Sequence, residues 1–349
     1  MYFVRTLITD MKRIVLLMSL ALLVKTQLQA QDPHFSQFFS SPLTLNPALT
    51  GKFDGVFRAA GNYRDQWPAI SKAFVTSTLS LDAPMLTNRI NPNDVWGLGL
   101  MAMTDRTANG ILNSNYISVS TSYHKGLDED GYHQLGFGFQ GTYASKRLDG
   151  TQLKFENELA LDGTWTLPSN EPVDGRSVNV NYFDFNAGLL YNGSTDGTNN
   201  FYLGASMYHI NRPKETYFGS GYYTLNPRLT VHGGGYFKVG ETTTLHLTAL
   251  YSQQAGAHET VLGGAVAFNL NNDQTENPTN FYAGSWLRFN DAIIPYMGLE
   301  WSDFRLGLTY DVNYSSLKVG SQSRGGIEVS LIYIKKPASG RKGIPCPKF

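Results

Sequence analysis

From residue 54 onward, apolar and polar residues alternate along this chain with a period of two. In one stretch, Ile117, Val119 and Tyr123 fall on one face, whereas Ser118 and Ser120 fall on the other. This period is typical of a β-strand, because successive side chains of a strand point to opposite faces, while a helix repeats about every 3.6 residues. The chain is therefore expected to fold from strands that each have one apolar and one polar face.

The pattern delimits fourteen segments, each roughly ten residues long, which is the length of a strand that crosses an outer membrane. Their predicted ranges are 54–66, 72–82, 95–104, 113–124, 132–144, 181–192, 200–210, 227–239, 241–252, 258–270, 279–290, 291–301, 303–313 and 325–335. An even number leaves both termini on the periplasmic side, as in single-chain bacterial barrels. Boundaries read from a pattern shift by a few residues, so twelve or sixteen strands remain alternatives.

The connections between these segments should differ at the two ends of the barrel, with short turns inside and long loops outside. The turns near 125–131, 193–199, 240 and 302 are assigned to the periplasm, and the loops 145–180 and 211–226 to the outside. Residues 271–280 break the rule, since this count places a long connection inside. That exception could indicate a miscounted strand.

The first thirty residues have the layout of a secretory signal. Lys12 and Arg13 precede an apolar run from Ile14 to Val24, and the small residue Ala30 ends a cleavage-like pattern. The apolar run is too short to cross a bilayer, which takes about 20 residues. Residues 1–30 are therefore predicted to be a cleaved signal peptide of an exported protein.

Composition narrows the class further. With 28 basic and 28 acidic residues the chain has no net charge, which argues against a nucleic-acid binder. Cys346 is the only cysteine, so no disulfide can form within the chain. A soluble β-sandwich would also alternate, but its outer face should be polar, whereas the outer face here is aromatic and aliphatic. The expected fold is all-β, a transmembrane antiparallel β-barrel of about 14 strands over residues 54–335, integral to the outer membrane.

Two segments flank the predicted barrel. Residues 31–53 contain Pro33, Pro42 and Pro47, which are poorly compatible with a membrane strand. Three phenylalanines in the same stretch would expose an apolar patch, so the segment is expected to be either a plug in the lumen or mouth of the barrel or a periplasmic tail. Residues 336–349 are basic and Pro-rich and are expected in the periplasm.

The inferred inner face is unusually rich in small residues. They are Gly136, Gly138, Gly188, Gly204, Ser206, Gly263, Ala265 and Ala267. Glycine in a strand permits close approach of another backbone, although strand curvature is the alternative explanation at any single position. As a set, they indicate an occupied lumen.

Charged residues also fall on the inferred inner face. Arg58, Arg64, Arg305, Asp311 and Glu328 are expected to neutralise one another, because buried charges in a membrane protein normally pair or line water. A binding role for Arg64 together with Trp67, near the first extracellular turn, is the alternative.

No arrangement typical of an enzyme is found. Ser206 and His209 are the best candidates for a nucleophile and its base. Residues three apart on a regular strand point to opposite faces, which argues against a lipid hydrolase. The histidines lack metal-ligand spacing, and 128–130 lacks the pattern of a calcium loop. We expect no catalytic residues, no cofactor and no metal.

Several sequence blocks resemble the PorP/SprF family of type IX secretion system outer-membrane proteins, found in Bacteroidota. They include Gln31-Asp32-Pro33-His34-Phe35-Ser36-Gln37, Leu45-Asn46-Pro47-Ala48, Asn62-Tyr63-Arg64-Asp65-Gln66-Trp67, Thr309-Tyr310-Asp311 and Gly325-Gly326-Ile327-Glu328. The resemblance covers about residues 31–347. It implies a barrel of the type IX export and gliding apparatus that pairs with secreted proteins or adhesins through their C-terminal domains.

The function expected from this resemblance is binding of the C-terminal domain of a cognate exported protein, for export or surface retention, together with other type IX components and outer-membrane lipid. The residues expected to take part in partner binding are Asn46, Pro47, Arg64, Trp67, Arg305, Asp311 and Glu328. A passive or hydrophobic-solute channel is the alternative, because a fold alone does not determine function. The identity of the partner stays open, since the chain departs from the common pattern at His34 and in the long loop 219–228.

Overall fold

The computed structural model describes residues 31–70, 74–87, 89–217, 221–271 and 279–336. The predicted signal peptide, the segment 337–349 and Cys346 lie outside the described residues.

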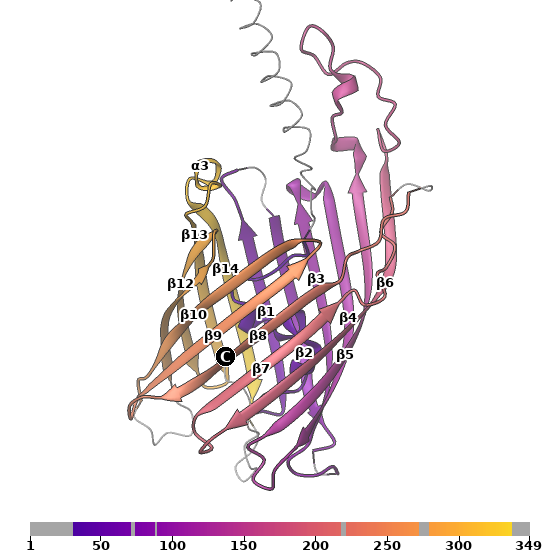
Figure 1. Ribbon diagram of the computed structural model, residues 1–349. Helices are drawn as coiled ribbons and strands as arrows, with labels where there is room; N and C mark the ends of the chain where they lie inside the picture. The colour runs from indigo at the N-terminus through magenta and orange to yellow at the C-terminus, as the bar shows by residue number, and fades with distance from the viewer. Residues whose placement is uncertain (1–30, 71–73, 88, 218–220, 272–278, 337–349) are drawn as a thin grey trace, which may run out of the picture. The chain divides into compact units, whose positions relative to one another are not determined.

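Within those ranges the chain forms fourteen antiparallel strands that close into a barrel (Figure 1). The strands are β1 (Phe57–Gln66), β2 (Phe74–Met85), β3 (Val95–Thr107), β4 (Leu112–Gly126), β5 (Gln134–Asp149), β6 (Ser177–Ser194), β7 (Asn200–Tyr208), β8 (Arg228–Lys238), β9 (Thr243–Gln254), β10 (Ala257–Asn269), β11 (Asn280–Arg288), β12 (Ala292–Trp301), β13 (Phe304–Asn313) and β14 (Arg324–Lys335). Each pairs with the next, and β1 pairs with β14, where Arg64 lies opposite Glu328. The predicted fold and strand count are confirmed.

Alternation along each strand separates lipid-facing from lumen-facing side chains. On β5, Phe139 is 63% exposed on the outside, whereas the neighbouring Gln140 is 3% exposed on the inside. The inner polar groups bond to one another, as the amide of Asn186 does in donating to Gln140 Oε1 at 2.9 Å. Closure is required because hydrocarbon offers no partner to the backbone groups of an open sheet edge. None of the helices in the described ranges is long and apolar enough to cross a membrane.

Connections at the two ends of the barrel differ as expected. We call the end where β1 begins and β14 finishes the periplasmic end, because the two longest connections lie at the other end, as expected of extracellular loops. The opposite end carries the long connections 150–176 and 209–227. The long connection between β10 and β11 at the periplasmic end does not come from a miscounted strand, since both strands pair with their expected neighbours.

The prediction of a loop over 145–180 is wrong at both ends. Strands β5 and β6 continue to Asp149 and start at Ser177, so the hairpin extends further than predicted (Figure 1). The physical reason is an apolar cluster of Ala144, Val180, Tyr182 and Leu225. These side chains pack together where the two strands continue beyond their predicted ends.

The β2–β3 connection is fastened to the periplasmic end of β4 through Asp94. Its carboxylate accepts hydrogen bonds from the Tyr123 hydroxyl at 2.6 Å, the Lys125 ammonium at 2.9 Å and the Gly126 amide at 2.9 Å. Burial would raise the pKa of this carboxyl, but the hydrogen bonds from Tyr123, Lys125 and Gly126 outweigh it and hold the pKa below its ordinary value.

An arginine on the lipid face should test the outward orientation of Phe139. Phe139→Arg at mid-strand is expected to lower the free energy of unfolding in lipid vesicles by about 2–4 kcal/mol, because a charge near the bilayer midplane is poorly solvated. Phe237→Arg, one residue before the end of β8, is the matched control with an expected cost of about 0–1 kcal/mol. Equal costs in urea titrations of the two variants would contradict this membrane placement.

Residues 33–53, which we call the inner segment, lie against the inward-facing side chains of the barrel. They form three short helical turns, Phe38–Ser40, Pro42–Leu45 and Pro47–Leu49. Pro42 and Pro47 each occupy the first helical turn, where proline is tolerated, and Asn46 caps the last one by accepting from the Ala48 amide. Apolar residues of this segment form the main core cluster with residues of β6, β7 and β9–β12.

Candidate functional site

Glycines on the inner face of the barrel make room for the inner segment. A Cβ added at Gly138 on β5 would lie 2.2 Å from the backbone nitrogen of Ala48, and one at Gly188 on β6 would lie 1.8 Å from Asn46 Oδ1. Real Cβ atoms do not approach other atoms so closely, so side chains at these two positions would exclude the segment. Gly136 instead faces His124, and Gly263 faces Trp286.

Asn46 is the best-connected residue of the inner segment's second half. It is fully buried, and its side-chain amide donates to the carbonyl oxygens of Leu189 at 2.9 Å and Ala205 at 3.3 Å. The same nitrogen lies 3.0 Å from His232 Nε2. Its side-chain oxygen accepts from the Ala48 amide, so Asn46 links strands β6, β7 and β8 to the turn that begins with Pro47.

Substitution of this asparagine should loosen the segment. Asn46→Ala is expected to reduce the free energy of unfolding by about 1–3 kcal/mol, because buried partners lose their hydrogen bonds without access to water. Asn93→Ala is the matched control, since Asn93 also donates to two carbonyl oxygens, those of Asp128 and Glu129, but in a solvent-exposed connection. Urea titration in detergent checks the difference, and an equal loss in both variants would contradict the role given to Asn46.

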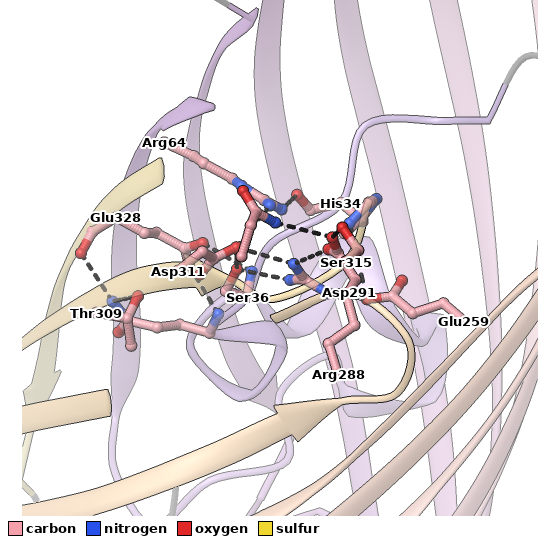
Figure 2. Close-up of polar contacts among 12 residues, drawn as sticks. His34, Ser36, Arg64, Glu259, Arg288, Asp291, Thr309, Asp311, Ser315 and Glu328 are labelled. Atoms are coloured by element: carbon pink, nitrogen blue, oxygen red, sulfur yellow. Dashed lines mark hydrogen bonds and ion pairs between the residues drawn. The ribbon is translucent and has the colours of Figure 1, made fainter. Parts of the chain in front are cut away.

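A cluster of charged side chains holds the start of the inner segment at the extracellular side of the lumen (Figure 2). Arg288 at the end of β11 lies 2.9 Å from Glu259, 2.9 Å from Asp311 and 3.2 Å from Asp291. Arg64 on β1 pairs with Asp311 at 3.1 Å and donates to the backbone carbonyl of His34. We call these five residues, Arg64, Glu259, Arg288, Asp291 and Asp311, the charged cluster. Each of them has at least one partner of opposite charge within the cluster.

Ser36 and Gln37 connect this cluster to β13 and β14. The Ser36 hydroxyl donates to Asp311 at 2.8 Å and lies 2.8 Å from the Arg288 guanidinium. Glu328 accepts the backbone amides of both residues, at 2.7 and 2.9 Å (Figure 2). The Gln37 amide group donates to Thr309 at 3.2 Å. Side chains from β11, β13 and β14 thus hold Ser36 and Gln37, and Arg64 on β1 holds the carbonyl of His34.

The structure brings together only some of the residues predicted for partner binding. Arg64, Asp311 and Glu328 meet around Ser36 and Gln37, whereas Asn46 and Pro47 lie in the next turns of the same segment. Arg305 is elsewhere and pairs with Glu300 at 2.6 Å. Trp67 also lies apart, in the first connection, where its ring packs on Phe74 at 5.5 Å.

The expectation that the inner charges neutralise one another is therefore correct only for Arg64 with Asp311. Arg58 pairs with Asp82 at 2.7 Å, and Arg305 with Glu300, neither of which belonged to the predicted set. Arg288, Glu259 and Asp291 were missed altogether. The alternation could have placed Arg288 on the inner face, since Tyr282 and Trp286 share that face on β11.

Ser206 and His209 do not form a catalytic pair in this structure. Strand β7 ends at Tyr208, and His209 takes a left-handed backbone conformation with φ of 58°, so the regular-strand argument does not extend to it. Ser206 donates to the Leu45 carbonyl at 2.7 Å, and His209 lies 3.0 Å from Asp184. Both side chains thus serve packing of the lumen. The described residues contain no group of three side chains suited to a metal ion.

The chain is similar to several solved structures at low sequence identity. It is similar to the toluene transporter TbuX of Ralstonia pickettii, at 12% identity and a TM-score of 0.49, covering 86% of this chain and 94% of that one. It is also similar to the toluene transporter TodX of Pseudomonas putida, at 11% identity and a TM-score of 0.48, covering 88% and 96%. At such identities and TM-scores the likeness carries no conclusion about function.

A comparison with curated protein sequences gave no match. A family model described as "Type IX secretion system membrane protein PorP/SprF" matches residues 27–333, which is nearly the whole barrel and the inner segment. The match includes the segment that occupies the lumen as well as the strands that hold it. The chain therefore belongs to the PorP/SprF family of type IX secretion system membrane proteins.

Proposed function

We propose that this outer-membrane component of type IX secretion binds the C-terminal domain of a cognate exported protein or adhesin and aids its passage or its retention at the surface. Family membership supports a role in secretion and contact with other secretion components. The observation that carries the proposal is the inner segment that crosses the lumen, because a barrel whose interior is obstructed by its own chain is poorly suited to passive diffusion.

The inner segment acts in this proposal as a plug. Its first residues are tied to β1, β11, β13 and β14 through Arg64, Arg288, Asp311 and Glu328, and its later residues to β6, β7 and β8 through Asn46. These strands lie on different sides of the closed sheet, so the segment crosses the lumen between them. Solute passage would require breaking buried hydrogen bonds, which makes the channel alternative the weaker candidate.

Partner binding by the seven predicted residues stays a prediction, and the geometry suggests how they would act. Asn46, Pro47, Arg64, Asp311 and Glu328 are covered by the protein's own contacts. A partner would reach them only after displacing the inner segment, so their effect on binding would be indirect. Trp67, half-buried in an extracellular connection, is the one best placed for direct contact.

Crosslinking in the native membrane tests the secretion role. The tagged protein is purified from outer membranes after gentle crosslinking, and its partners are identified by mass spectrometry. We expect a large exported protein attached through its C-terminal domain, with a lower yield for Trp67→Ala and an unchanged yield for the lipid-facing control Leu79→Ala. Recovery of the barrel without any exported protein would contradict the proposal.

Conductance in planar bilayers tests the plug separately. The intact protein is expected to conduct poorly, and deletion of residues 32–50 is expected to raise the conductance several-fold. An unchanged conductance after the deletion would show that the inner segment does not close the barrel. High conductance of the intact protein would instead favour the passive channel.

A further inference from the structure

A cavity of about 550 Å³ lies in the periplasmic half of the lumen, on the side of the inner segment away from the charged cluster. The inner segment forms one wall of it with Phe38, Phe39, Leu45 and Leu49. The opposite wall comes from the periplasmic halves of the strands β7–β14 and includes Tyr202, Tyr236, Tyr282, His232 and His246. Its size is that of a typical binding site. Its lining combines aromatic rings with charged side chains, several of which lie at the periplasmic rim, such as Lys238, Glu241 and Asp303.

The charges inside this cavity are mostly matched within the barrel. Arg58 pairs with Asp82 at 2.7 Å, and Arg305 pairs with Glu300 at 2.6 Å and also lies over the Tyr282 ring at 5.3 Å. The Lys52 ammonium donates to Gln134. A small ionic ligand is therefore not needed to neutralise the site. The aromatic rings favour an occupant with apolar groups, and the charged rim favours one that also carries charged groups.

The position of Lys336 points to such an occupant. Lys336 is the last described residue after β14, and its side chain lines the same cavity. The chain continues for thirteen residues, 337–349, which is a reach of up to about 45 Å if extended. That is more than enough to enter the lumen from its rim. Because the segment is tethered there, its effective concentration at the cavity is of the order of mM, well above that of most free ligands.

The sequence of this segment fits the cavity. Ile344, Pro345, Cys346 and Pro347 form an apolar stretch, and Arg341 and Lys342 precede it. An apolar stretch rich in proline loses little conformational entropy on binding, since proline already restricts the backbone. The basic residues would remain toward the rim, where Glu241 and Asp303 line the cavity.

We propose that residues 337–349 of this chain bind in the aromatic cavity and fill the periplasmic half of the lumen. The barrel is then occupied by its own chain from both ends, by the inner segment and by the segment after β14. This inference does not depend on the identity of an exported partner.

The single cysteine of the chain gives a direct test. A second cysteine is introduced into the full-length protein at Thr244 or Ala267, which line the cavity on β9 and β10. The matched controls are Leu247→Cys and Phe268→Cys, on the lipid face of the same strands. Outer membranes are treated with diamide, and the intramolecular disulfide with Cys346 is detected by mass spectrometry. We expect a disulfide for at least one of the two cavity positions and for neither of the lipid-facing ones.

A second measurement reports occupancy without requiring the two sulfur atoms to meet. In a Cys346→Ser background, Ala267→Cys is labelled with a water-soluble maleimide in the full chain and in a chain that ends at Lys336. We expect at least tenfold slower labelling in the full chain. Equal labelling rates together with no disulfide at either cavity position would overturn the proposal. Slow labelling in both chains would overturn it too, because another occupant would then fill the cavity.

Discussion

Arg288→Met is expected to lower the free energy of unfolding by about 3–5 kcal/mol, because it removes a buried cation that the buried Asp311 and the half-buried Glu259 and Asp291 share. The Arg288 guanidinium lies within 3.2 Å of Glu259, Asp291 and Asp311 and also contacts the Ser36 hydroxyl. Methionine keeps most of the side-chain volume but none of the charge. Arg64 still pairs with Asp311 in this variant, so Glu259 and Asp291 lose the most.

An exposed ion pair provides the control for this variant. Lys125 lies 2.9 Å from Asp94, but its side chain is 55% exposed. Lys125→Met should therefore cost less than about 1 kcal/mol, since water screens and replaces such a pair. Urea unfolding followed by tryptophan fluorescence in detergent measures both variants. If Arg288→Met is no more harmful than Lys125→Met, the charged cluster does not stabilise the inner segment.

The fold could be predicted because a membrane strand encodes its orientation locally. Phe139 and Gln140 differ in polarity because one meets lipid and the other the lumen, and this contrast recurs along every strand. The ends of β5 and β6 could not be predicted in the same way. Beyond the membrane, the strands continue because Tyr182 and Leu225 pack together, and Leu225 comes from a connection far along the chain.

The pairing of the inner charges could be predicted only in part, because a period of two gives the face of a strand but not its register. Arg64 and Glu328 face inward by sequence, yet they come to the same site only because β1 closes the barrel against β14. The inner segment has no period at all. Its course depends on side chains such as Asn46, whose partners lie 143 to 186 residues away.

The small residues of the inner face are the sequence feature that best predicts an occupied lumen, because glycine permits close approach of another backbone. Gly138 and Gly188 now have a specific reason, because each lies against the backbone or cap of the turn at Asn46 to Ala48. The sequence could not distinguish these two from Gly136 or Gly263, whose neighbours belong to the barrel strands themselves. Only the path of the inner segment shows which glycines lie against it and which lie against other strands of the barrel.

The double variant Gly138→Val/Gly188→Val is accordingly expected to expel the second half of the inner segment from the lumen. The added Cβ atoms would lie 2.2 Å from the Ala48 nitrogen and 1.8 Å from Asn46 Oδ1. A backbone nitrogen cannot rotate away as the end of a flexible side chain can, so the segment must move as a unit. Overpacking of this kind costs about 1–3 kcal/mol at each position. Amide hydrogen exchange should show loss of protection at Asn46, Ala48 and Thr50 while the barrel strands stay protected.

Gly141→Val separates this effect from the general cost of valine in place of glycine. Gly141 lies on β5 three residues from Gly138 but faces lipid, where an added Cβ would meet only the Phe185 ring at 3.9 Å. Exchange at Asn46 and Ala48 should therefore be unchanged in this control, and conductance should rise in the double variant alone. Protection that survives in the double variant would mean that the inner segment can shift within the lumen without leaving it. Loss of protection in both proteins would mean that valine disturbs β5 itself, and the glycines would then serve the strand and not the segment.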